Sequence, residues 1–391
     1  MWIKRDFSRF FNDIASLPVK VLKGPRQVGK TSFLERLGTH QTVYLDDLSL
    51  RTQANENPRF FLDQMSSRII LDEAALAPAL FPEIKRRVDQ ARRSRGSKES
   101  QEIDIWITGS NQTILQKTVR ESLAGRASYF DMNTLSIHEI GESWSLTDYL
   151  FKGGWPELYV SSELSPVRYL NDFITSFVEK DIVAAAGIER KAAFAKCLQL
   201  IAGRVGQLFN AANIGAASGA DTTTIQSWVS LLEDNGLLRR VAPYFTNLNK
   251  RLIKSPKIYF EDVGLATRLQ GWTEAMPLIA SPAAGSLIEN MALSEISRFF
   301  LSRGEKPSVY FVRSKEKVEV DFLIALPNNR FIAAEVKSTP QDLSEAQVSL
   351  LETLKLNIID RWIVSPTPAP AFRFARTVCF TDIWDELNSC Y

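Results

Sequence analysis

The residues from Gly24 to Ser32 have the types and spacing of a loop that binds phosphate. Gly24 and Gly29 let backbone N–H groups close around phosphate oxygens, and Lys30 can reach the β- and γ-phosphates of a nucleotide. The Thr31 hydroxyl is a typical ligand of Mg²⁺ in such loops. The residues that we expect to bind ATP are Gly24, Pro25, Arg26, Gln27, Val28, Gly29, Lys30, Thr31 and Ser32.

Two carboxylates follow an apolar segment, Arg68-Ile-Ile-Leu-Asp-Glu73. Acidic groups at the end of a buried strand can serve a nucleotide site, so we expect Asp72 to hold Mg²⁺ through water. Hydrolysis also needs a group that polarises the attacking water, and Glu73 is the candidate. The alternative is a strand that ends in a solvated acidic turn.

Further polar residues are candidates for contact with the γ-phosphate. The apolar segment that ends at Ile107 is followed by Thr-Gly-Ser-Asn111, which places Ser110 or Asn111 at the carboxyl edge of a sheet. Arg126 is a candidate arginine finger, because a guanidinium can neutralise charge on the transferring phosphoryl group. An ordinary surface arginine is the alternative.

The elements that position these residues alternate between strand and helix. Short apolar strands are predicted at 19–22, 42–45, 68–71 and 103–107, with helical stretches between them, which indicates a parallel α/β sheet over residues 1–142. A helical connector is expected over 143–192. Helices followed by an apolar strand over 193–248 have a winged-helix pattern. Residues 249–391 read as a second α/β domain.

In this order, these motifs resemble the AAA-type P-loop ATPases of bacteria and archaea that carry a C-terminal domain of uncertain function. The resemblance rests on the phosphate loop, Leu-Asp-Glu73, Thr-Gly-Ser110 and Glu-Ser-Leu-Ala-Gly-Arg126, and it continues through Gly153-Gly-Trp-Pro-Glu157, Glu179-Lys-Asp-Ile182 and Lys257-Ile-Tyr-Phe-Glu-Asp262. It implies an α/β fold class: a P-loop AAA-type ATPase core, a winged-helix middle domain and a C-terminal restriction-endonuclease-like domain. Assembly into a ring or spiral of identical subunits is also implied.

The last domain offers carboxylates and a lysine that resemble a PD-(D/E)XK nuclease core. Glu335 and Lys337 project from one face of a strand, and a neighbouring strand can bring Asp321 beside them. Asp321 and Glu335, with Glu289 from a helix, could hold Mg²⁺, and Lys337 could stabilise charge or orient water. The alternative is a structural carboxylate-lysine pair in a fold without nuclease activity.

Two regions are candidates for contact with DNA. A basic stretch between the Asp72 and Thr-Gly-Ser110 strands suits sequence-independent phosphate contact, and its key residues are Arg92, Arg93, Arg95 and Lys98. A solvated basic loop is the alternative. The second region is the helix expected at 222–234 with Arg239 and Arg240 after it, although its acidic end would repel phosphate.

Composition limits the remaining possibilities. Lysine plus arginine number 47 against 45 acidic residues, so bulk charge does not indicate a nucleic-acid partner. Two histidines make a zinc site or a Ser-His-Asp triad improbable, and three scattered cysteines suit a reducing compartment. No apolar run suggests a signal peptide or membrane span, so we expect a cytoplasmic protein. The predicted function is an oligomeric ATPase that acts on branched or single-stranded DNA. A nucleotide-dependent regulatory switch or protein remodeller is the alternative.

Overall fold

The N-terminal sheet is parallel throughout and has the order β2-β3-β4-β1-β5. A computed structural model of the chain describes residues 2–7, 17–94, 102–109, 112–183, 186–244 and 255–391. Buried apolar side chains line the central strands, as expected for strands covered on both faces. The strands are β1 (Val19–Lys23), β2 (Gln41–Tyr44), β3 (Arg68–Asp72), β4 (Asp104–Thr108) and β5 (Ala127–Asp131), and the principal helices are α2 (Lys30–Glu35), α3 (Leu48–Glu56), α4 (Pro58–Asp63), α5 (Leu80–Arg93) and α6 (Gln112–Ser122).

The middle of the chain is mainly helical and contains a two-stranded antiparallel hairpin. Its first helices are α7 (Ile137–Ile140), α8 (Leu146–Lys152), α9 (Glu157–Val160), α10 (Pro166–Phe173) and the π-helical segment η3 (Ile174–Ile182). They are followed by α12 (Lys191–Ala202), α13 (Ala211–Ser218) and α14 (Thr222–Asp234), then by β6 (Leu238–Val241), β7 (Lys257–Phe260), α15 (Val263–Leu269) and α16 (Ala275–Ile279). Because β7 pairs with β6, the hairpin spans the domain boundary predicted between residues 248 and 249.

The C-terminal sheet is mixed and has the order β12-β11-β10-β9-β8. The β8–β9 and β9–β10 pairs are antiparallel, whereas β10–β11 and β11–β12 are parallel. The strands are β8 (Val309–Arg313), β9 (Glu319–Leu326), β10 (Arg330–Val336), β11 (Asn357–Ser365) and β12 (Arg376–Cys379), and the helices are α18 (Glu345–Thr353) and α19 (Ile383–Cys390).

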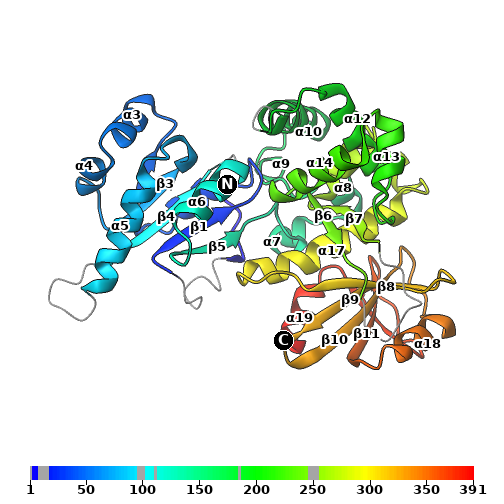
Figure 1. Cartoon of the computed structure of the whole chain (residues 1–391). Coiled ribbons are helices and arrows are strands. Elements are labelled where there is room, and N and C mark those ends of the chain that lie inside the picture. Colours follow the sequence, from blue (N-terminus) through cyan, green and yellow to red (C-terminus); the bar gives the residue numbers. More distant parts are fainter. Residues whose placement is uncertain (1, 8–16, 95–101, 110–111, 184–185, 245–254) are drawn as a thin grey trace.

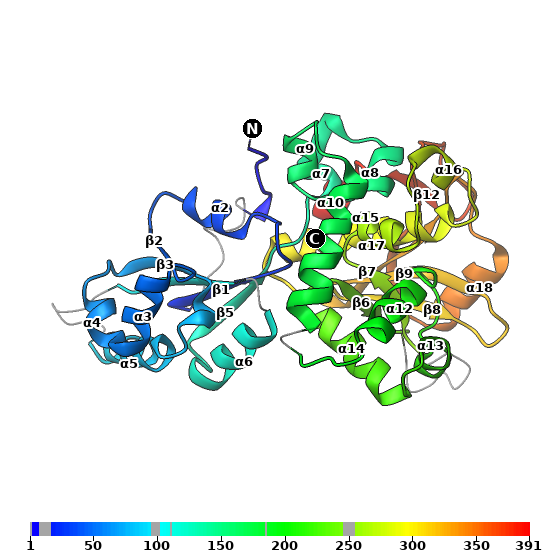
Figure 2. The same cartoon turned by 90° about the horizontal axis from the view of Figure 1, so that it is seen from above.

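A long buried helix, α17 (Ala284–Ser302), joins the parts of the molecule. It contacts β5 of the N-terminal sheet, α8 and β7 of the middle region, and β10 of the C-terminal sheet. In Figure 1 it runs between the helical middle region and the C-terminal sheet, and Figure 2 shows the N-terminal sheet set to one side of both. Among the described helices, none combines the length and the apolar character needed to cross a membrane.

Candidate functional site

The phosphate loop follows β1 directly, at the carboxyl edge of the N-terminal sheet. Gly24 has φ +139°, and a Cβ at this position would lie 1.9 Å from the Met132 carbonyl oxygen, so a side chain does not fit. Gly29 has φ +86° and caps the start of α2. Backbone conformation therefore favours glycine at both positions, and the close approach to Met132 requires it at Gly24.

Lys30 is buried within this loop, with its side chain turned back toward the loop's own backbone. Its Nζ donates to the carbonyl oxygens of Gly24 (2.9 Å) and Pro25 (2.6 Å). Burial lowers the pKa of Lys30 to about 8, and the charges of Glu73 and Asp72 offset only part of that effect. Phosphate oxygens could replace the two carbonyl acceptors, and their negative charge would favour the ammonium form.

Thr31 and Asp72 come together as a pair of oxygen groups. The Thr31 hydroxyl donates to Asp72 Oδ1 at 2.8 Å across the α2–β3 contact. Burial raises the pKa of Asp72, against the opposing effect of this hydrogen bond, so a cation would stabilise its charged form. Hydroxyl and carboxylate oxygens are suitable ligands for Mg²⁺ beside phosphates, and the donor set fits that ion.

Glu73 and the end of β4 lie side by side. Glu73 adopts a left-handed conformation (φ 53°, ψ 38°), and a Cβ built on Gly109 would lie 3.5 Å from its Oε2 atom. Asn111 and Ser110 fall outside the described residues. Gln112, which the sequence analysis missed, donates from Nε2 to the Gly109 carbonyl (2.6 Å) and the Gly24 carbonyl (3.1 Å). It links the β4 end to the phosphate loop.

The middle region also contacts the phosphate loop. Gly236, in the turn between α14 and β6, lies so close that a Cβ on it would be 3.2 Å from Pro25 Cδ. The Arg26 guanidinium lies over the Phe177 ring of η3, with 5.9 Å between its Cζ atom and the ring centroid. From the N-terminal segment, Arg5 donates to the Val28 carbonyl at 2.8 Å. A rearrangement of the loop would therefore bear directly on the middle region.

Arg126 lies at the opposite edge of the sheet. Its carbonyl accepts from the amide of Val19, where β1 begins, whereas the phosphate loop follows the end of this five-residue strand. That separation is about 16 Å at roughly 3.3 Å per residue. Its guanidinium forms a two-pronged ion pair with Asp89 of α5, at 2.6 and 2.8 Å. Within one subunit the structure does not bring Arg126 to Lys30, and its role as a finger stays a prediction.

In the C-terminal sheet the structure brings Asp321, Glu335 and Lys337 together. The Asp321 amide donates to Glu335 Oε2 (3.2 Å), the Val336 amide donates to Asp321 Oδ2 (2.9 Å), and Lys337 Nζ donates to Glu335 Oε1 (2.8 Å). Burial raises the pKa of both Asp321 and Glu335 to about 7. The strand alternation predicted from the sequence explains the placement of all three side chains.

A lysine that the sequence analysis did not single out lies among these carboxylates. Lys257 of β7 has a side chain only 1% exposed, and its Nζ lies 2.8 Å from Glu289, 2.5 Å from Glu319 and 3.9 Å from Asp321. Burial lowers its pKa, but the charges of Glu289, Asp321 and Glu319 outweigh that effect, so its pKa is raised. Among the described residues no group of three or more His, Cys, Asp and Glu side chains is arranged to hold a metal ion. An ammonium group thus lies beside the oxygens predicted to be metal ligands.

The predicted DNA contacts are only partly within the described residues. Arg95 and Lys98 fall outside them, whereas Arg92 and Arg93 form the last turn of α5. Arg92 donates to the Gly125 carbonyl at 2.8 Å and so contacts its own chain. In the predicted recognition helix α14, Glu233 forms an ion pair with Arg240, which directs that arginine toward protein.

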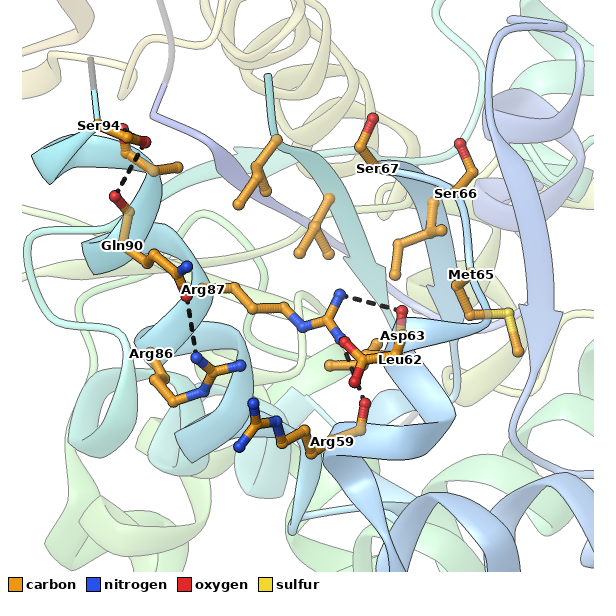
Figure 3. A pocket seen from close by; sticks show the side chains of 14 residues that line it. Arg59, Leu62, Asp63, Met65, Ser66, Ser67, Arg86, Arg87, Gln90 and Ser94 are labelled. Carbon is orange, nitrogen blue, oxygen red and sulfur yellow. Dashed lines mark hydrogen bonds and ion pairs between the residues drawn. The ribbon is translucent and has the colours of Figure 1, made fainter. Parts of the chain in front are cut away.

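A cavity of about 350 Å³ lies between α4, α5 and the starts of β3 and β4, away from the phosphate loop. Figure 3 shows Arg86 and Arg87 along one wall and Ser66 and Ser67 opposite them. The two guanidiniums are already engaged: Arg86 pairs with Glu83, and Arg87 pairs with Glu83 and Asp63. The cavity is therefore less basic than its lining residues suggest.

A buried polar network, also missed from the sequence, joins the motifs behind the family resemblance. Asp262 accepts from Thr134 Oγ1 (2.7 Å), the Gly154 amide (2.9 Å) and Trp155 Nε1 (3.0 Å). Arg298 of α17 donates to the same Thr134 hydroxyl at 2.7 Å. The network binds the end of the N-terminal region to the middle helices and α17. Its signal in the sequence is the pair of motifs around Gly154 and Asp262.

Three family models match successive parts of the chain. Residues 16–141 match an AAA domain, residues 143–275 match a domain of unknown function (DUF8612), and residues 284–375 match another domain of unknown function (DUF4143).

Three relatives that match over most of the chain are described as uncharacterized proteins. Those of Mycobacterium tuberculosis and Mycobacterium bovis are 29% identical over 344 residues, which cover 87% of this chain and 75% of theirs. One from Haemophilus influenzae is 23% identical over 330 residues, covering 78% of this chain and 79% of its own.

Among solved structures, a Walker-type ATPase of Pyrococcus abyssi aligns with 68% of this chain and 94% of its own, at 15% identity and a TM-score of 0.38. That score is too low to establish a shared fold. The AAA match coincides with the β2-β3-β4-β1-β5 sheet and the phosphate loop on it. Residues 16–141 are therefore a P-loop ATPase domain of the AAA type.

Proposed function

We propose that this chain is a Mg²⁺-dependent ATPase that works as a homo-oligomer, in a ring or spiral, and remodels or moves along branched or single-stranded DNA. The observation that carries the ATPase chemistry is the convergence of Lys30, Thr31, Asp72 and Glu73 at one edge of the sheet. Lys30 and the loop amides would bind phosphate, Thr31 and Asp72 would hold Mg²⁺, and Glu73 would polarise the attacking water. Mg²⁺ would neutralise charge on the phosphates.

Oligomeric action is supported by the position of Arg126. It lies a full strand length, about 16 Å, from the phosphate loop of its own subunit. An arginine finger at this position must serve the nucleotide of a second copy. Homo-oligomers with a head-to-tail interface place different surfaces of neighbouring subunits in contact, as this arrangement requires.

Coupling of nucleotide state to movement is supported by the contacts of Pro25 with Gly236 and of Arg26 with Phe177. If the loop rearranges around phosphate, either both contacts break or the middle region moves together with the loop. The order of α12, α13 and α14 before the β6–β7 hairpin, with Leu208 bridged to Lys257, supports a winged-helix arrangement for that region.

DNA as the substrate is supported by the basic residues where α5 ends, among which Arg93 belongs to the last turn. A nuclease activity has less support. The pairing of Asp321, Glu335 and Lys337 suits a PD-(D/E)XK-like domain, but Lys257 lies where a cation would be needed. We therefore assign no nuclease activity to this domain.

ATP turnover with and without DNA tests the proposal. We expect single-stranded or branched DNA to raise turnover, with a sequence-independent affinity that falls steeply with salt. Replacing Arg93 and Arg95 with glutamine should flatten that salt dependence, and Arg51→Gln on α3 is the matched control. An ATP turnover rate that no DNA changes at low salt would contradict DNA as the substrate.

A nucleotide-dependent regulatory switch or protein remodeller is the second candidate. The ion pairs of Arg240 with Glu233 and of Lys257 with Glu289 and Glu319 favour it, because they commit charges in the middle and C-terminal regions to protein contacts. This candidate predicts turnover that is insensitive to DNA but changes when a stable protein partner binds.

A further inference from the structure

Arg126 is held by α5 through two adjacent contacts. The Asp89 carboxylate accepts two hydrogen bonds from the guanidinium of Arg126, from Nε to Oδ1 at 2.6 Å and from Nη2 to Oδ2 at 2.8 Å. One turn later on the same helix, Arg92 donates to the carbonyl of Gly125 at 2.8 Å. A single helix thus fixes both the side chain of Arg126 and the backbone immediately before it.

The backbone around Arg126 is itself constrained. The Arg126 amide donates to the Leu123 carbonyl at 2.9 Å, and Leu123 is fully buried. Gly125 has φ +72°, a conformation that favours glycine. The turn from Leu123 to Arg126 therefore presents the arginine at a fixed place on the sheet edge.

The ion pair leaves part of the guanidinium available. An arginine side chain carries five N–H donors, and in the structure Arg126 uses one on Nε, one on Nη2 and one on Nη1, the last to the Ala124 carbonyl at 3.0 Å. Within the described part of the chain, one N–H on each terminal nitrogen of Arg126 has no acceptor. N–H groups on the terminal nitrogens of a guanidinium can pair with phosphate oxygens.

We propose that Asp89 is a positioning residue for ATP hydrolysis: it holds Arg126 so that the terminal nitrogens of its guanidinium meet the nucleotide bound to a second copy of this chain. Arg92 supports the same turn and is assigned to this role instead of to DNA. The inference rests on the proposed function, because it needs ATP turnover in an oligomer. It adds a residue on α5 whose side chain never touches the nucleotide.

A surface ion pair often contributes little, so the test must separate positioning from simple stability. Asp89→Asn keeps the shape of the side chain and removes its charge, and Asp89→Glu keeps the charge. Asp63→Asn is the matched control, because Asp63 forms an exposed ion pair with Arg87 of the same helix. For each full-length variant, kcat, KM, ATP affinity and the assembled mass are measured without DNA.

We expect Asp89→Asn to lower kcat about tenfold or more, with ATP affinity and assembled mass unchanged. Asp89→Glu should recover part of that loss, and Asp63→Asn should behave like wild type. Arg126→Ala should lose more, about 10³-fold. Adding Asp89→Asn to Arg126→Ala should cost nothing further, because the two residues act as one unit. Mixing Asp89→Asn with Lys30→Ala subunits should restore turnover, since each supplies what the other lacks.

Several results would overturn the inference. A wild-type kcat for Asp89→Asn beside a low kcat for Arg126→Ala would remove Asp89 from the reaction and leave the proposed function intact. Losses that multiply in the double variant would show two independent roles. A fall in assembled mass that alone accounts for the lost kcat would make the pair an interface element. Absence of turnover in wild type would instead overturn the proposed function, and this inference with it.

Discussion

Two regions of this chain combine carboxylates with a buried lysine, and they use the lysine in opposite ways. In the phosphate loop, Lys30 donates to two backbone carbonyls, and burial lowers its pKa to about 8. In the C-terminal sheet, Lys257 lies between Glu289 and Glu319, and the surrounding negative charge raises its pKa despite burial. Similar residue types therefore produce one site that still gains from a polyanion and another whose lysine is already paired with carboxylates.

The chemistry of a set of residue types depends on what already surrounds its lysine. Carboxylates near a lysine predict a catalytic site only if the lysine is not already paired with them, so that its charge can still neutralise a ligand. Lys30 has neutral acceptors that phosphate oxygens can replace, whereas displacing Lys257 would leave buried carboxylates without a counter-charge. The comparison thus predicts that the two lysines differ in what their removal costs: turnover for one, folding for the other.

The largest expected effect is that of Lys30→Ala on ATP turnover. Loss of the ammonium removes charge stabilisation of the transferring phosphoryl group, so we expect turnover to fall by about 100-fold or more. Phosphate release by the purified chain measures it. Lys257→Met is the comparison variant, and it should turn over ATP at the wild-type rate under conditions in which it is folded. Equal losses in both variants would break the distinction between the two sites.

Glu73→Gln should also lower turnover by about 100-fold, through a different step. The amide keeps the size of the side chain but cannot polarise water as a carboxylate does. ATP affinity should stay near that of wild type, and the variant should retain unhydrolysed ATP. Titration with a fluorescent nucleotide, followed by chemical quenching of the bound material, distinguishes binding from hydrolysis. An unaltered rate would show that another group polarises the water.

Lys257→Met should destabilise the chain by about 3–5 kcal/mol, because it leaves buried carboxylates without their partner. Lys337→Met is the control, since the Lys337 side chain is 34% exposed and its loss should cost much less. Denaturant unfolding, monitored by hydrogen exchange in β9 and β10, measures the loss of stability in both variants. If Lys257→Met is as stable as wild type, Lys257 is not the counter-charge of this cluster.

A further expected effect on stability concerns pH. The pKa values of Asp321 and Glu335 are raised to about 7 by burial, whereas the unfolded chain loses these protons near pH 4. Unfolding therefore releases protons between pH 4 and 7, and the free energy of unfolding of the C-terminal sheet should fall as pH rises through that range.

Asp321→Asn should flatten this pH dependence, and the exposed Glu345→Gln should not. Each pKa unit of difference corresponds to about 1.4 kcal/mol. Thermal melting at pH 5 and pH 8 is a sufficient measurement. A stability that rises across this range in wild type would contradict the raised pKa values.

Local patterns were enough to predict several of the residues that lie together at the candidate nucleotide site. The apolar run of β3 and the two acids that follow it are adjacent in the chain, and the glycines that the phosphate loop requires are a few residues apart. Strand alternation likewise placed Glu335 beside Lys337. Each of these predictions depends on contacts between neighbours in sequence, which spacing alone constrains.

Other features depend on distant contacts and were missed. The edge strands β5 (Ala-Ser-Tyr-Phe-Asp) and β12 (Arg-Thr-Val-Cys) are short and partly polar, so they lack a clear strand pattern. Lys257 meets Glu289 and Glu319 only after the hairpin packs on the C-terminal sheet. No local pattern marks a lysine as the partner of acids that lie many residues away.

The most direct test of this account is Mg²⁺-dependent ATP turnover by the purified chain, measured in parallel for wild type, Lys30→Ala and the double variant Asp321→Asn/Glu335→Gln. We predict turnover by wild type, at least a 100-fold loss in Lys30→Ala, and a rate within about twofold of wild type in the double variant, because distant sites are nearly independent. Turnover that survives Lys30→Ala, or that disappears in a folded double variant, would contradict it.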